Sequence, residues 1–121
     1  MTKIPNSKRY DLEDRTLVFA KKVRAFVKKL PRSISNTEDI RQLVRASGSV
    51  GANYIEANES LSKKDFIMRI KISRKEAKEG RYWLKLVDTN NAQDLEKSRH
   101  SLIYEATELM NIFGAILQKS K

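Results

Sequence analysis

The sequence predicts an all-α protein, an antiparallel four-helix bundle with up-down-up-down topology. Apolar and small residues recur at intervals of three and four along four blocks, and no strand-like alternation persists. Only two prolines and four glycines interrupt a chain of 121 residues. Short connections between consecutive helices favour antiparallel neighbours. The length suits one domain, so residues 1–121 are expected to form a single bundle.

The first two helices are predicted over about residues 12–30 and 37–60, and residues 1–10 are expected to be flexible. Pro31 ends the first helix, because proline has no amide hydrogen to donate. The second helix starts near Asn36 or Thr37. The apolar seam of the first helix consists of Phe19, Val23, Phe26 and Leu30. The seam of the second consists of Ile40, Leu43, Ser47, Val50, Tyr54 and Ala57.

The last two helices are predicted over about residues 63–88 and 93–118. Ser62 starts the third helix, and Asp65 follows three residues later, as in a capping box. The fourth helix follows the turn TNNAQD. The seam of the third helix consists of Phe66, Ile70, Ser73, Ala77, Gly80, Leu84 and Val87. The seam of the fourth consists of Leu102, Ala106, Leu109, Phe113 and Ile116.

The stretch SGSVGANYIEA (residues 47–57) places two glycines inside the second helix. Each glycine costs a helix interior about 1 kcal/mol relative to alanine. Small side chains allow another backbone to approach closely, which would offset this cost. A helix kink at Gly48 or Gly51 is the competing explanation. Both explanations are structural, and neither implies chemistry.

The formal net charge of +10 is concentrated in two parts of the chain. Residues 1–32 carry ten basic and three acidic side chains, and residues 62–85 carry nine and three. A basic excess confined to particular elements points to a polyanionic partner, although lysine-rich surfaces often serve solubility alone. The nucleic-acid-binding candidates on the first helix are Lys21, Lys22, Arg24, Lys28 and Lys29. Those on the third helix are Lys63, Lys64, Lys71, Arg74, Lys75, Lys78 and Arg81.

The third helix carries a second apolar stripe, separate from its seam and from its lysines. The stripe consists of Met68, Ile72, Trp83 and Leu86. A helix of an isolated bundle needs one stripe only, so the second predicts an interface between subunits. The small residues Gly48, Gly51 and Ala52 of the second helix are further interface candidates. The alternative is that Trp83 only caps the edge of the bundle.

The sequence offers no residues for enzyme chemistry. The absence of cysteine excludes disulfides and thiolate metal sites. The residue three before the single histidine, His100, is Lys97, so the Glu-x-x-His motif of di-iron bundles is missing. We therefore expect a protein without catalytic residues, cofactor or metal. No apolar run approaches the roughly 18 residues of a membrane span, and the N-terminus lacks a signal-peptide core, so a cytoplasmic location is predicted.

Four sequence blocks resemble the bacterial "four helix bundle protein" family, also called the 23S ribosomal RNA intervening-sequence protein or S23 family. The resemblance covers roughly residues 17–117. The blocks are LPRS (30–33), QLVRASGSVGANYIEA (42–57), SKKDF (62–66) and RKEAKEGRYWLKL (74–86). Gly80 stands where the family pattern leads us to expect a small polar residue, and Tyr54 where it leads us to expect a smaller one.

The resemblance implies a four-helix bundle that assembles as a homopentamer. It also implies kinship with the accessory variability determinants of diversity-generating retroelements, which are basic pentamers that associate with nucleic acid and a reverse transcriptase. Two functional hypotheses follow, and they do not exclude each other. The first is a non-catalytic oligomeric RNA- or DNA-binding protein that uses the basic faces of the first and third helices. The second is a scaffold or adaptor for a protein, for example a reverse transcriptase-like partner.

Overall fold

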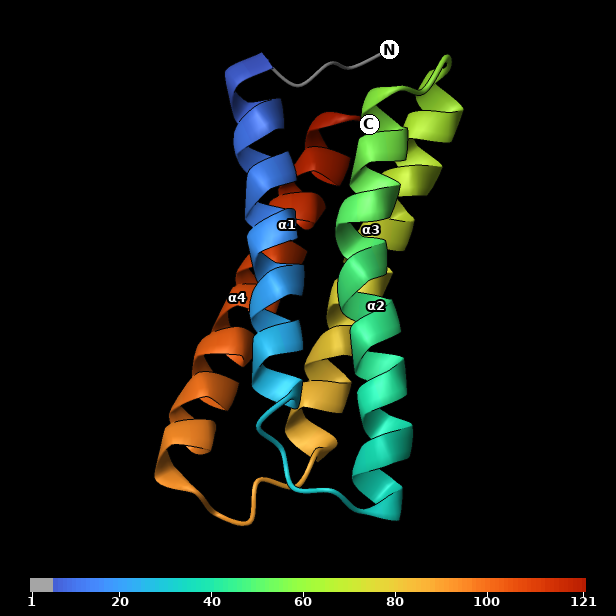
Figure 1. Cartoon of the computed structure of the whole chain (residues 1–121). Helices are drawn as coiled ribbons and strands as arrows, with labels where there is room; N and C mark the ends of the chain where they lie inside the picture. Colours follow the sequence, from blue (N-terminus) through green and yellow to red (C-terminus); the bar gives the residue numbers. More distant parts are fainter. Residues whose placement is uncertain (1–5) are drawn as a thin grey trace.

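The computed structural model describes the backbone of residues 6–121 and the side chains of residues 11–121. It contains four helices: α1 (Asn6–Val27), α2 (Ile34–Asn58), α3 (Lys63–Leu86) and α4 (Gln93–Lys119). Consecutive helices run antiparallel and lie side by side (Figure 1). In the described residues α1 packs on α2 and α4, and α3 packs on the same two helices, while α1 and α3 lie diagonally, with no Cα atoms within 8 Å of each other. The predicted all-α four-helix bundle is confirmed.

The core is built from the four predicted seams. Each seam residue of α1 and α3 is buried, and Ile40 and Ile116 are the half-buried members of the other two seams. Tyr54, larger than the family pattern leads us to expect, is fully buried, with its ring centroid 5.8 Å from that of Phe113. None of the described helices combines the length and apolar character that crossing a bilayer requires.

The helix boundaries differ most from the prediction at both ends of α1 and at the start of α2. α1 begins at Asn6 rather than near residue 12, because no proline or glycine interrupts the charged segment after Pro5. Residues 6–10, predicted to be flexible, are therefore helical, and residues 1–5 lie outside the described residues. α1 ends at Val27, short of Leu30, because the residues preceding a proline disfavour the α conformation. α2 begins at Ile34, earlier than predicted, because the Ser33 hydroxyl accepts a hydrogen bond from the Asn36 amide.

The connection between α3 and α4 is set by asparagine and by a buried amide. α3 ends at Leu86, just before the predicted limit of 88, because Val87 is extended. Asn90 and Asn91 adopt φ values of 55° and 60°, a region that asparagine tolerates better than most residues. The buried Asn36 side chain donates to the carbonyls of Pro31 and Asp88 and accepts from the Asp88 amide. It thereby ties this connection to the α1–α2 connection.

The glycines of α2 mark a close contact with α1. A Cβ atom added to Gly51 would lie 2.8 Å from Thr16 Oγ1, closer than side chains can pack. One added to Gly48 would lie 3.3 Å from Arg24 Nη2. α2 continues without interruption through both positions. The close approach of another helix within the same chain therefore accounts for the two glycines.

Candidate nucleic-acid interface

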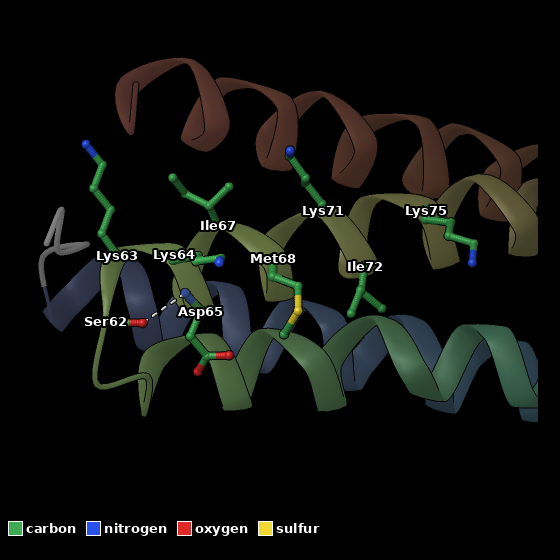
Figure 2. Close-up of a pocket in the computed structure, with 9 residues that line it drawn as sticks. All are labelled: Ser62, Lys63, Lys64, Asp65, Ile67, Met68, Lys71, Ile72 and Lys75. Atoms are coloured by element: carbon green, nitrogen blue, oxygen red, sulfur yellow. Dashed lines mark hydrogen bonds between the residues drawn. The ribbon is translucent and has the colours of Figure 1, made fainter.

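The predicted lysines of α3 stand free on its outer side. Lys63, Lys64, Lys71, Lys75 and Lys78 are all exposed. Figure 2 shows Lys64, Lys71 and Lys75 along α3, with Asp65 as the one carboxylate among the residues drawn. The ion pairs of residues 11–121 involve other side chains, namely Arg15–Glu105, Arg45–Glu76, Arg45–Glu79 and Arg99–Glu96. These lysine charges are therefore available to an anionic partner.

The arginines of the same prediction lie closer to their neighbours. Arg81 is half-buried, and its Nη1 donates to Thr107 Oγ1 of α4 at 3.2 Å. Arg74 is exposed but lies against α4, with Nε 3.5 Å from the position of a Cβ on Gly114. Arg24 Nη1 donates to the Ala20 carbonyl of its own helix at 3.2 Å. These arginines therefore contact neighbouring helical residues, and the lysines supply most of the positive charge that has no partner in the described residues.

Two glutamates of α3, Glu76 and Glu79, share one arginine of α2. Arg45 Nη1 lies 3.3 Å from Glu76 Oε2, and Arg45 Nη2 lies 3.6 Å from Glu79 Oε2. Burial raises the pKa of Glu76, and the neighbouring Glu79 raises this pKa further, while Arg45 opposes the shift. Arg45 belongs to α2, so the spacing of residues within α3 does not indicate it as the partner of these glutamates. With these carboxylates paired, the lysines dominate the field on the outer side.

The second apolar stripe of α3 is only partly covered. Met68 and Leu86 are 46% and 49% exposed, and Ile72 and Trp83 are half-buried. Trp83 packs against the core, and its ring meets the exposed ring of Tyr82 edge-on at a centroid distance of 5.0 Å. Figure 2 shows Met68 and Ile72 directed to the α2 side of α3, along a hollow of about 940 Å³. Apolar and cationic groups therefore share this surface.

The remaining interface candidates belong to α2. Gly48 and Gly51 face Arg24 and Thr16 of α1, so their space is filled from within the chain. Ala52 is exposed. The structure therefore brings Ala52, but not the two glycines, to a surface that a second copy could reach.

The basic residues of α1 form a second surface, apart from that of α3. Lys21, Lys22, Lys28 and Lys29 are exposed and take part in none of the ion pairs of residues 11–121. α1 and α3 occupy opposite corners of the four-helix arrangement (Figure 1). The two predicted basic faces therefore do not merge into one patch on a single chain.

Three polar residues that were not predicted from the sequence, Thr89, Glu96 and Arg99, stabilise the end of the bundle next to these surfaces. Arg99 Nη1 donates to the carbonyls of Leu84 and Val87 at the end of α3, where helix carbonyls lack partners. Arg99 also pairs with Glu96, which accepts from the Thr89 hydroxyl. The Thr89 hydroxyl and the Arg99 guanidinium lower the pKa of Glu96. Glu96 and Arg99 lie one turn apart on α4, whereas the contact of Arg99 with the end of α3 depends on how the two helices are arranged.

The described side chains offer no metal site to set beside this interface. Within residues 11–121 no group of three or more histidine, aspartate and glutamate side chains is placed to hold an ion. His100 is exposed on α4. The features that the structure does bring together on α3 are exposed lysines and partly exposed apolar side chains.

Comparison with known proteins agrees with the motifs in the sequence. A family model described as "23S rRNA-intervening sequence protein" matches residues 8–115. The chain belongs to this family. It is similar to the crystal structure of a protein with unknown function from the S23 ribosomal protein family of Bacteroides thetaiotaomicron VPI-5482. The two chains are 28% identical, the match covers 92% of this chain and 98% of that one, and the TM-score is 0.78. No curated protein matches the chain.

Proposed function

We propose that this 23S rRNA-intervening sequence protein is a non-catalytic, homo-oligomeric accessory protein of the cytoplasm that binds nucleic acid. The observation that carries the proposal is the row of exposed, unpaired lysines on α3: Lys64, Lys71, Lys75 and Lys78. Lysine meets phosphate as a point charge, so the expected contacts position a nucleic-acid backbone and do not read its sequence. The family name makes structured RNA the first ligand to test.

Fluorescence anisotropy with a labelled structured RNA tests the proposal. Neutralised phosphates release counterions, so the affinity should fall steeply between about 50 and 200 mM salt. The variant with Lys71, Lys75 and Lys78 replaced by glutamate should lose binding and keep its helicity and assembly mass. An affinity that does not change with salt contradicts the proposal.

A matched variant separates the lysine row from the overall charge. Arg41, Lys119 and Lys121 are exposed and lie outside the row. Their replacement by glutamate changes the net charge by the same amount as the reversal of the three α3 lysines. This control should keep most of the binding, and equal loss in both variants would assign the effect to net charge alone.

Homo-oligomerisation is supported by the exposed part of the second apolar stripe, Met68 and Leu86. Kinship with pentameric relatives suggests five copies, which would repeat the lysine row and add avidity. Light scattering on the purified protein measures the assembly mass. Replacing Met68 and Leu86 with glutamate should shift the protein to its monomer mass, and a monomeric parent protein would contradict this part of the proposal.

A protein adaptor is the second candidate function. The same stripe would anchor a partner such as a reverse transcriptase-like protein, and the lysines would steer an acidic face toward it. Pull-down from lysate with and without nuclease separates the two functions. A protein retained after nuclease treatment favours the adaptor, and retention of nucleic acid alone favours the first function.

A further inference from the structure

A second polar surface lies between α1 and α4, where the two helices diverge toward the end at which α1 stops and α4 starts (Figure 1). A groove of about 400 Å³ opens there. Its polar lining consists of Lys22 from α1, Lys29 from the turn after α1, and Lys97, Ser98 and Ser101 from α4. An adjoining hollow of about 200 Å³ shares Lys22 and Ser101 with it. We refer to these five side chains as the α1–α4 groove.

The donors of the α1–α4 groove have no partners in the described chain. None of its lysines takes part in an ion pair of residues 11–121. Helical serines commonly donate to the carbonyl four residues earlier, as Ser60 and Ser120 do. Among the serines and threonines of residues 11–121, the side chains without a hydrogen bond are Ser49, Ser98 and Ser101. Unused hydroxyls are thus gathered beside unused ammonium groups.

The negative groups nearby do not cancel this charge. Glu105 lines the adjoining hollow, but Arg15 holds both of its carboxylate oxygens, at 2.7 and 2.8 Å. Asp94, one turn before Ser98 on α4, is exposed and does not line the groove. The groove is therefore a cationic channel with hydroxyl donors on the α4 side. Lysine and serine in combination are typical ligands of backbone phosphates in nucleic-acid complexes.

We propose that the α1–α4 groove binds phosphate groups of a nucleic-acid backbone, with Lys22, Lys29 and Lys97 neutralising charge and Ser98 and Ser101 donating hydrogen bonds. This inference rests on the proposed function and adds a second contact region to it. α1 and α3 lie diagonally across the bundle, so the groove and the α3 lysine row engage separate parts of the ligand. Each region therefore adds its own phosphates to the counterion release.

Anisotropy titrations with a 20-base-pair RNA duplex, over a salt series, test the groove. The variant Lys22→Met, Lys29→Met, Lys97→Met should lower the slope of log affinity against log salt by about 3, since each lost phosphate contact removes about 0.9. The variant Ser98→Ala, Ser101→Ala should bind about 10-fold more weakly with an unchanged slope, because it loses hydrogen bonds but no charge. Ser49→Ala, which removes an unused hydroxyl on α2, should bind as the parent does.

The outcomes separate this inference from the function on which it rests. If the parent protein does not bind the duplex, the proposed function and the groove both fail. If the α3 variant loses binding while both groove variants bind as the parent does, only the groove inference is overturned. The five side chains of the α1–α4 groove are exposed. The buried residues Phe26 and Leu102, which also line this hollow, stay unchanged, so the thermal unfolding temperature should be the same in every groove variant. A duplex DNA of the same sequence shows whether the groove distinguishes the two backbones.

Discussion

The two sides of α1 differ in how closely the neighbouring helix approaches. On the α2 side, a Cβ on Gly51 would already collide with Thr16, at 2.8 Å. On the α4 side, hollows of about 310, 200 and 400 Å³ open between the helices. The ion pair of Arg15 with Glu105, at 2.7 Å, bridges this open side. α1 therefore packs tightly against α2 and is separated from α4 by open hollows.

The difference shows that the size of the facing side chains sets the spacing of these helices. Gly51 of α2 admits the side chain of Thr16, which is itself buried. The glycine of α4, Gly114, faces Arg74 of α3 instead. Toward α1, α4 presents Leu102 and Ile116, which keep the helices apart, while the smaller Ser98, Ser101 and Ala115 beside them leave the hollows open. The closed side contributes stability, and the open side leaves lysines and serines accessible to a ligand.

Breaking the closed side should have the largest effect. Replacing Gly51 with leucine forces a side chain into the space of Thr16, whose hydroxyl is held by the Glu13 carbonyl at 2.9 Å. We expect a loss of about 3 kcal/mol in the free energy of unfolding, from overpacking. Urea denaturation followed by circular dichroism measures it. Ala115→Leu adds similar bulk at an exposed position of α4 beside the open α1–α4 hollow and should stay within about 0.5 kcal/mol of the parent.

A glycine without a close neighbour sharpens the comparison. Gly80 is buried in α3, yet a Cβ placed on it would meet nothing within 4 Å. Gly80→Ala should therefore raise the free energy of unfolding by about 1 kcal/mol, through better helix propensity and a less flexible unfolded chain. The same denaturation experiment measures this gain. If Gly80→Ala destabilises the protein as Gly51→Leu does, close helix contact is not what distinguishes the two glycines.

Breaking the open side should have the smallest effect. Glu105 holds Arg15 through two hydrogen bonds and raises the pKa of the guanidinium. The Arg15 side chain is still 40% exposed, so solvent weakens the pair. Arg15→Met should cost about 0.5 kcal/mol, and high salt should reduce the difference. Arg41→Met, at an exposed arginine without an ion pair, should cost nothing measurable. A loss of several kcal/mol at Arg15 would mean that the open side is as tightly coupled as the closed one.

The buried seams were predictable because helical periodicity is a local property. Phe19, Val50, Ile70 and Phe113 repeat at the spacing of one helix face, and each is buried. The exposed α3 lysines follow from the same geometry, since they lie opposite the seam. The start of α2 was predicted too late because Ser33 was not recognised as its cap.

Other features depended on residues far apart in the chain. Asn36 joins two connections through Asp88, and Arg45 pairs with Glu76 across the α2–α3 contact. The α1–α4 groove needs Lys29 and Ser98 at a common edge. No spacing along the sequence predicts which polar groups meet in this way.

By itself, the sequence determined the fold class, the family, the four seams and the outward direction of the α3 lysines, because each depends on the order of residues within one helix. Only the tertiary structure decided that α1 packs closely against Gly51 of α2 and that Arg81 donates a hydrogen bond to Thr107 of α4. It also decided that Lys22 and Lys29 share a groove with serines of α4. The physical reason is that the residue order within a helix fixes which side chains share a face, but it does not fix which other helix packs against that face. The bulk of the facing side chains determines which neighbour comes close and which charges remain free.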